Sequence, residues 1–207
     1  MSTVNTAISG NHNHNHNDSE TQDLKYMGFW IYLMTDLLIF GSLFATFAVL
    51  RNGSFGNITH QELAGDSMHT AILETIFLLL SSFTSGLAVL FLKTKKVKPV
   101  LSMLVVTLVF GLGFLYLEVS EFVHLFSEGH SFTASAFLSS FFGLIGTHGL
   151  HIIIGCLWIV GLIIQLALRE INEVTERKVK VFSLYWHFLE IVWIFIFTFV
   201  YLYGVIK

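Results

Sequence analysis

Five long apolar stretches dominate the chain, and short polar segments separate them. Each stretch has at least the ~20 residues that a helix needs to cross a bilayer. Inside a bilayer the backbone must satisfy its own hydrogen bonds, so apolar segments of this length are helical. The pattern predicts an all-α protein, a bundle of five transmembrane helices within residues 27–207. The stretches cover residues 27–50, 70–92, 99–126, 134–168 and 180–206.

The fourth stretch is longer than a membrane is thick. Its roughly 34 residues would make a helix about 51 Å long at 1.5 Å per residue. This helix is therefore expected to tilt, bend or protrude.

Composition supports a membrane protein and excludes several other classes. Apolar residues make up 54% of the chain and charged residues 12%, about half the charge of a soluble domain. The net charge is −3, and the basic residues form short clusters between the apolar stretches. We therefore expect no nucleic-acid partner. The chain has one cysteine, Cys156, which excludes an intramolecular disulfide.

The first 26 residues are polar and contain alternating histidine and asparagine. His12, His14 and His16 alternate with Asn13, Asn15 and Asn17. This composition predicts a helix-poor, disordered cytoplasmic tail over residues 1–26. Alternating imidazoles are also typical of tracts that bind divalent cations, which stays a hypothesis for this tail.

The distribution of lysine and arginine predicts the orientation in the membrane. Nine of these residues fall on one side and two on the other, and the basic side of a membrane protein is cytoplasmic. The even-numbered loops and the N-terminus are therefore predicted to be cytoplasmic, and the C-terminus periplasmic. The nine are Lys25, Lys93, Lys95, Lys96, Lys98, Arg169, Arg177, Lys178 and Lys180; the two are Arg51 and Lys207.

Nine ionisable residues lie within the apolar stretches. A charge at the centre of a bilayer costs about 3 kcal/mol or more, so such residues face a bundle interior, a partner protein or water. We expect them to serve mainly as hydrogen-bonding links between helices. The nine are Asp36, Glu74, Glu118, Glu121, His124, His148, His151, His187 and Glu190.

The helical rise of 1.5 Å per residue divides these residues into two groups by depth. An outer group lies near the periplasmic ends of the second and third helices. An inner group lies in the lower parts of the fourth and fifth helices, and Asp36 lies in the cytoplasmic half or near the middle of the membrane. The predicted outer group is Glu74, Glu118, Glu121 and His124, and the inner group is His148, His151, His187 and Glu190.

Two alternative functions use the same residues. Di-iron sites in helical bundles use Glu-x-x-His on two helices together with a glutamate from each of two others. Only Glu121 and His124 follow that order, so a stand-alone metalloenzyme built on Glu121, His124, His148 and His151 is a less favoured alternative. Intramembrane carboxylates also suit a proton or ion transporter. The sequence shows no inverted repeat that supports a transporter.

Ordered motifs in all five stretches resemble those of subunit III of the haem–copper respiratory oxidases. The similarity covers about residues 25–205. The short five-helix form, the aspartate in YLMTD and the His-rich tail are most like the quinol oxidases of cytochrome bo type. The motifs are GFWIYLMTD at 28–36 with LFATF at 43–47, LET at 73–75 with SS at 81–82, LEVSEF at 117–122, GTHGLH at 146–151, and YWHFLEIVW at 185–193 with YLYG at 201–204.

This resemblance implies a non-catalytic subunit of a proton-pumping terminal quinol oxidase in the bacterial cytoplasmic (inner) membrane. It implies no catalytic, metal-binding or cofactor-binding residue on this chain, with haem and copper on a large subunit I. The nine ionisable residues become structural or lipid-cleft candidates. Expected partners are subunit I, subunit II, a small subunit IV and phospholipid. Asp36 matches the acidic position of the family's corresponding helix, which implies a structural or lipid-cleft role. Subunit III of a cytochrome c oxidase is the alternative, and Glu190 stands where the family pattern has aspartate.

Overall fold

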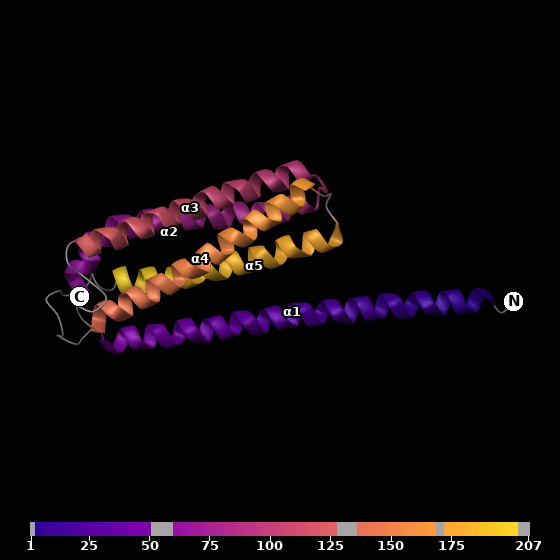
Figure 1. Cartoon of the computed structure of the whole chain (residues 1–207), viewed down its shortest axis with the longest axis horizontal. Helices are drawn as coiled ribbons and strands as arrows, with labels where there is room; N and C mark the ends of the chain where they lie inside the picture. The colour runs from indigo at the N-terminus through magenta and orange to yellow at the C-terminus, as the bar shows by residue number, and fades with distance from the viewer. Residues whose placement is uncertain (1–2, 51–59, 128–135, 169–171, 203–207) are drawn as a thin grey trace. The chain divides into compact units, whose positions relative to one another are not determined.

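The computed structural model describes residues 3–50, 60–127, 136–168 and 172–202, and this part of the chain is helical apart from the turn at residues 93–96 and Asn172. The prediction of an all-α protein is confirmed. The described residues form five long helices, the last of which continues into a short π-helical segment, η1. Figure 1 labels the helices α1 to α5. The elements are α1 (Thr3–Leu50), α2 (His60–Leu92), α3 (Val97–Ser127), α4 (Ala136–Leu168), α5 (Glu173–Ile196) and η1 (Phe197–Leu202).

Each helix contains an apolar span long enough to cross a membrane, as predicted. The fifth span starts six residues before the predicted start at residue 180. Lysine and arginine can begin a membrane helix because their long apolar stems lie along it while the charge reaches the interface. Arg177, Lys178 and Lys180 lie in these first turns of α5. The spans are Met27–Leu50, Met68–Leu92, Val97–Ser127, Ala136–Leu168 and Val174–Leu202.

The polar N-terminal segment differs from expectation, because α1 begins at Thr3 and continues through it. The sequence had indicated a helix-poor tail over residues 1–26. Nucleation is the costly step of helix formation, and the membrane-spanning part of α1 supplies a nucleus from which the helix can extend. The chain's only proline is Pro99, so no proline in residues 3–26 interrupts the extension. A separate cytoplasmic role for residues 1–26 stays a prediction.

The chain divides into two compact units, Met1–Ser42 and Leu43–Lys207. In the second unit, α2, α3, α4 and α5 form a closed four-helix bundle. α2 packs against α3 and α5, and α4 packs against the same two helices. Consecutive helices run in opposite directions, as their colours in Figure 1 show. This topology brings residues on α2 and α5, about 100 positions apart, into direct contact.

The basic residues of α2–α5 that the structure describes lie at one end of this bundle. Lys93, Lys95 and Lys96 occupy the turn between α2 and α3, and α5 begins at the same end. Glu176, near the start of α5, interacts electrostatically with Lys95. The positive-inside rule requires the basic residues of these loops to lie at the same end of the bundle. The side of the membrane that this end faces stays a prediction, and Arg51, Arg169 and Lys207 lie outside the described residues.

Apolar side chains cover the outside of the bundle, while aromatic rings and small residues fill its interior. Leu112, Leu157 and Phe83 are exposed, as side chains that face lipid must be. Trp186 on α5 is buried at the centre, where it contacts Gly111 of α3 on one side and Gly155 of α4 on the other. Lipid chains are as apolar as leucine, so membrane helices associate through such close packing and through interhelical hydrogen bonds.

Candidate functional site

A buried hydrogen-bond chain links three helices around Trp186. The indole Nε1 of Trp186 donates to the hydroxyl of Ser81 on α2 at 2.9 Å. Ser81 in turn donates to the backbone carbonyl of Thr107 on α3 at 3.1 Å. The hydroxyls of Thr84 and Thr107 are also bonded, at 2.8 Å. Trp186 and Ser81 therefore each donate to a neighbouring helix, while the Thr107 hydroxyl donates to the Met103 carbonyl of its own helix at 2.9 Å. These bonds fix α2, α3 and α5 at this depth.

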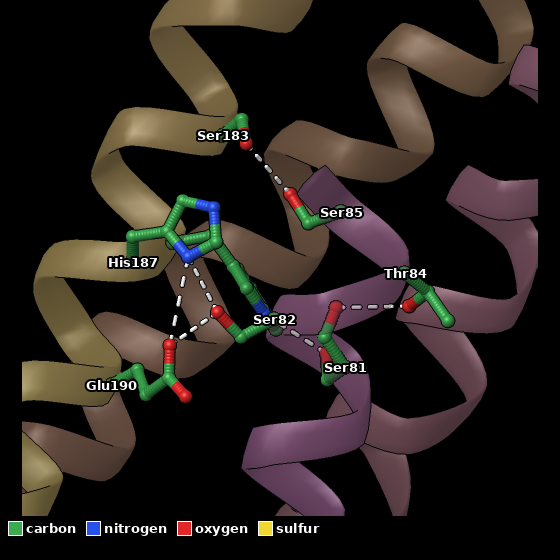
Figure 2. Close-up of polar contacts among 8 residues, drawn as sticks. Ser81, Ser82, Thr84, Ser85, Ser183, His187 and Glu190 are labelled. Atoms are coloured by element: carbon green, nitrogen blue, oxygen red, sulfur yellow. Dashed lines mark hydrogen bonds and ion pairs between the residues drawn. The ribbon is translucent and has the colours of Figure 1, made fainter. Parts of the chain in front are cut away.

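Ser82, His187 and Glu190 form a second polar group, which we call the Ser82 cluster. Figure 2 shows the three side chains pointing toward one another between α2 and α5. The Ser82 hydroxyl donates to Glu190 Oε2 and lies 2.5 Å from His187 Nδ1. Nδ1 and Glu190 Oε2 are 3.5 Å apart. One turn away, Ser85 donates to Ser183 at 3.1 Å, so two polar contacts hold α2 to α5.

His148 is fully buried in an aromatic environment farther along the bundle. Its ring centroid lies 5.8 Å from that of Phe114 on α3 and 5.4 Å from that of Trp193 on α5. The Phe114 and Trp193 centroids are 4.8 Å apart in an edge-to-face arrangement. Trp193 Nε1 donates to the Thr75 hydroxyl at 3.0 Å, which connects α5 to α2. His148 is therefore part of a packed aromatic layer.

Three carboxyl groups and a tyrosine gather at the same end as this layer. Glu74 on α2 interacts electrostatically with Glu118 and Glu121 on α3. The hydroxyl of Tyr201 on η1 donates to Glu121 Oε1 at 3.2 Å. Both carboxyl oxygens of Glu74 and of Glu118 are buried, with no hydrogen-bond partner among the described residues. This acidic layer is the part of the predicted outer group that the structure assembles.

Close packing of α3 on α4 depends on a glycine opposite Glu118. A Cβ atom built on Gly149 would lie 2.7 Å from Glu118 Cδ, well inside van der Waals contact. A methyl group at this position would therefore force the Glu118 carboxyl group to move. His124, the fourth predicted member of the outer group, lies in the exposed last turns of α3.

The predicted inner group is wrong for His148. Gly155 of α4 contacts Trp186 of α5. Gly155 therefore lies at the same depth as Trp186 and as the next residue of α5, His187. His148 lies seven residues from Gly155, about 10 Å along α4, and its ring meets Trp193. The prediction took depths along α4 from the rise of a straight helix. In the structure, the register of α4 against α5 places His148 about two turns away from His187. His187 and Glu190 do meet, as predicted.

His151 and Asp36 complete the set of candidate residues. His151 Nδ1 lies 2.7 Å from the Thr147 carbonyl, and the His151 carbonyl accepts a hydrogen bond from Tyr185 at 3.0 Å. Asp36 lies on α1, within the unit Met1–Ser42, at i+3 from Leu33. Its structural or lipid-cleft role stays a prediction.

The residues of the metalloenzyme alternative do not converge in the part of the chain that the structure describes. No group of three or more His, Cys, Asp or Glu side chains there is placed to hold a metal ion. The arrangement instead stabilises helix contacts, since imidazole, hydroxyl and indole groups bond to neighbouring helices. Sequence analysis did not identify the role of Trp186, Trp193 or Tyr201, although all three lie in motifs that carry the family resemblance.

The fold is that of a polytopic membrane protein with a polar, aromatic bundle interior, and known proteins share its sequence pattern. Residues 3–205 match the family described as Cytochrome c oxidase subunit III. The quinol oxidase subunit 3 of Bacillus spizizenii is 47% identical over 90% of both chains. The cytochrome bo(3) ubiquinol oxidase subunit 3 of Pseudomonas putida is 43% identical over 90% of this chain and 89% of that one.

A relative named for cytochrome c instead of quinol is similar to this chain to a comparable degree. The cytochrome c oxidase subunit 3 of Bacillus sp. strain PS3 is 43% identical over 88% of this chain and 87% of that protein. The chain belongs to the cytochrome c oxidase subunit III family. It is accordingly a multi-pass protein of the bacterial cytoplasmic membrane and the third subunit of a terminal respiratory oxidase.

Proposed function

We propose that this chain is the non-catalytic third subunit of a terminal oxidase that takes electrons from quinol. The observation that carries the proposal is the similarity, over 90% of both chains, to relatives named quinol oxidase subunit 3. Electrons would pass from quinol to oxygen through haem and copper on the large subunit I. Subunit II and a small subunit IV would complete the complex, with the N-terminus in the cytoplasm.

The bundle interior supports a stabilising role for the chain. Trp186, Trp193 and Tyr201 each use their polar atom in a bond to another helix. Such bonds hold the helices in one arrangement and contribute roughly 1 kcal/mol each. A rigid bundle of this kind is suited to hold subunit I and bound phospholipid in place during turnover. Asp36 is the proposed contact to the lipid cleft.

A cytochrome c oxidase is the second candidate. The relative from Bacillus sp. strain PS3 carries that name at 43% identity, close to the values for the quinol oxidase relatives. The two candidates differ only in the electron donor of the whole complex, so they give the same fold and the same interior contacts here.

Oxidase assays on the native complex test both parts of the proposal. The complex is purified through a tag on this chain, and oxygen uptake is measured with a quinol and with reduced cytochrome c as donors. We expect oxidation of the quinol. A complex from a strain without this chain, purified instead through a tag on the large subunit, should start at a similar rate but lose activity faster. Oxidation of cytochrome c alone would establish the second candidate, and a tagged chain without an oxidase would refute the proposal.

A further inference from the structure

The turn between α2 and α3 carries a positive charge that nearby acids do not balance. Residues 93–98 have the sequence KTKKVK, which contains four lysines and no acid, whereas residues 169–180 hold four basic and three acidic residues. Lys95 interacts electrostatically with Glu176, but Glu176 already accepts a hydrogen bond from Lys180 at 2.6 Å. No other ion pair or side-chain hydrogen bond engages these four lysines in the part of the chain that the structure describes. The surplus charge at this end of the bundle therefore lies in the turn.

Local structure disfavours lysine at two positions of this segment. Lys95 has a φ of 52°, in the left-handed region where a side chain is unfavourable and glycine is preferred. Lys98 lies in the first turn of α3, where the positive end of the helix dipole disfavours a cation. Residues that are unfavourable for the local backbone cluster where the side chain serves another purpose. These lysines are therefore not explained by the stability of the turn.

The turn lies at the edge of the hydrocarbon layer. The membrane span of α2 ends at Leu92 and that of α3 begins at Val97, so only four residues separate the two spans. The lysine side chains at 93, 95, 96 and 98 are all exposed. A lysine at this level lies beside the phosphate groups of lipids, and each one favours an anionic surface about fivefold.

An exposed apolar stripe continues from Lys98 along the same face of α3. Val105, Val109 and Leu112 follow at helical spacing, and all three are exposed. The distance from Lys98 to Leu112 is about 21 Å along the helix. One leaflet of the hydrocarbon core is about 15 Å thick, half of the whole. A cationic contact is thus followed by an apolar contact as long as an acyl chain's path through one leaflet.

We propose that the α2–α3 turn and the adjoining face of α3 bind a phospholipid whose headgroup has a net negative charge. The lysines contact the headgroup phosphate, and Val105 and Val109 contact an acyl chain. A second copy of this chain does not fit, because lysines would oppose lysines. The inference goes beyond the proposed function, since it names the headgroup charge and the residues that select it, and it uses no residue of the unit Met1–Ser42.

Photo-crosslinking with lipid probes tests this site in the intact oxidase. The complex is reconstituted into phosphatidylcholine vesicles with a trace of either phosphatidylglycerol or phosphatidylcholine that carries a photoactivatable acyl chain. Adducts are then mapped on peptides of α3. We expect phosphatidylglycerol to label the region of Val105 and Val109 preferentially, and high salt to reduce this preference by screening. Val119 and Val123, exposed toward the other end of α3, are the internal control and should show no preference.

Substitutions connect the preference to the lysines. Lys96→Gln and Lys98→Gln should each lower it about fivefold, and together roughly thirtyfold. Lys95→Gly should also lower it while leaving the stability of the chain equal or higher, because glycine is favoured at this φ. The matched control is Lys178→Gln, which removes the same charge at the same end from an ammonium group that donates to Gln165 Oε1 at 3.0 Å. This control should leave the preference unchanged.

Several results would overturn the inference. They are equal labelling by the two lipids, a preference that Lys96→Gln and Lys98→Gln leave unaffected, and an equal loss in Lys178→Gln, which would indicate an effect of net charge alone. Competition by inorganic phosphate, but not by sodium chloride at equal ionic strength, would indicate a site for a soluble anion. Labelling of the isolated chain that disappears in the intact oxidase would mean that another subunit covers the turn.

The proposed function fails separately, if no haem-bearing subunit purifies with the tagged wild-type chain. The same labelling measurement on the full chain in vesicles would then still test the lipid site. An intact oxidase that shows no preference for phosphatidylglycerol at Val105 and Val109 refutes the inference alone.

Discussion

Gly155→Ala tests the central packing contact of the bundle, because Trp186 leaves no room for a methyl group there. A Cβ atom on Gly155 would lie 2.7 Å from Trp186 Cζ3 and 3.3 Å from Tyr185 Cε1. The Trp186 side chain has little freedom to move away, because its ring also packs against Gly111 of α3 and its Nε1 donates a hydrogen bond to Ser81. The clash must therefore displace α4 or break the Trp186 hydrogen bond.

The magnitude follows from comparison with Gly143→Ala on the same helix. A Cβ atom on Gly143 would meet no described atom within 4 Å. Both substitutions gain the same helix propensity, up to about 1 kcal/mol, so this gain cancels in the difference between them. Overpacking costs about 1–3 kcal/mol. The free energy of unfolding of Gly155→Ala should therefore be about 1–3 kcal/mol below that of Gly143→Ala.

The assay is reversible unfolding of the purified chain in mixed micelles, with SDS as denaturant and helix content followed by circular dichroism. Gly143→Ala should match or exceed the stability of the wild type. Equal stability of the two variants would refute the packing argument, because it would mean that Trp186 does not occupy the space beside Gly155.

Other substitutions probe the hydrogen bonds and the lipid contact. Trp186→Phe should lower the free energy of unfolding by about 1 kcal/mol through loss of the bond to Ser81. A double-mutant cycle with Ser81→Ala in the same assay should show coupling, and additive effects would contradict that bond. Tyr201→Phe removes the donor to Glu121 and should also cost about 1 kcal/mol, and a stability equal to wild type would count against this contact. Asp36→Ala should leave assembly of the oxidase intact while reducing bound phospholipid or the lifetime of turnover; wild-type lipid content and inactivation rate would refute its proposed role.

Hydropathy was sufficient to predict the five spans because a bilayer imposes a simple physical requirement. A span needs about 20 apolar residues, and its backbone must be helical. The predicted first span, residues 27–50, coincides with Met27–Leu50. The fifth began earlier than predicted because lysine and arginine in the first turns of α5 do not end a membrane helix.

The contacts between helices were harder to predict, since they depend on rotation and register that hydropathy does not encode. The i, i+3 spacing correctly placed His187 beside Glu190. It gave no information on how α4 aligns with α5, so His148 was assigned to the wrong depth. The small-residue pattern of Ser82 and Gly86 lies where α2 meets α5, but only the structure shows that His187 occupies the space above Gly86.

The central claim is that acids and imidazoles in this bundle hold helices and partners together, while the redox centre belongs to another subunit. The most direct test is a reduced-minus-oxidised absorbance spectrum of the tagged chain, recorded in the intact oxidase and again after the subunits are separated in detergent. The account predicts haem bands in the complex and none in the separated chain. A separated chain that keeps a stoichiometric redox-active cofactor, or that reduces oxygen unaided, would contradict it.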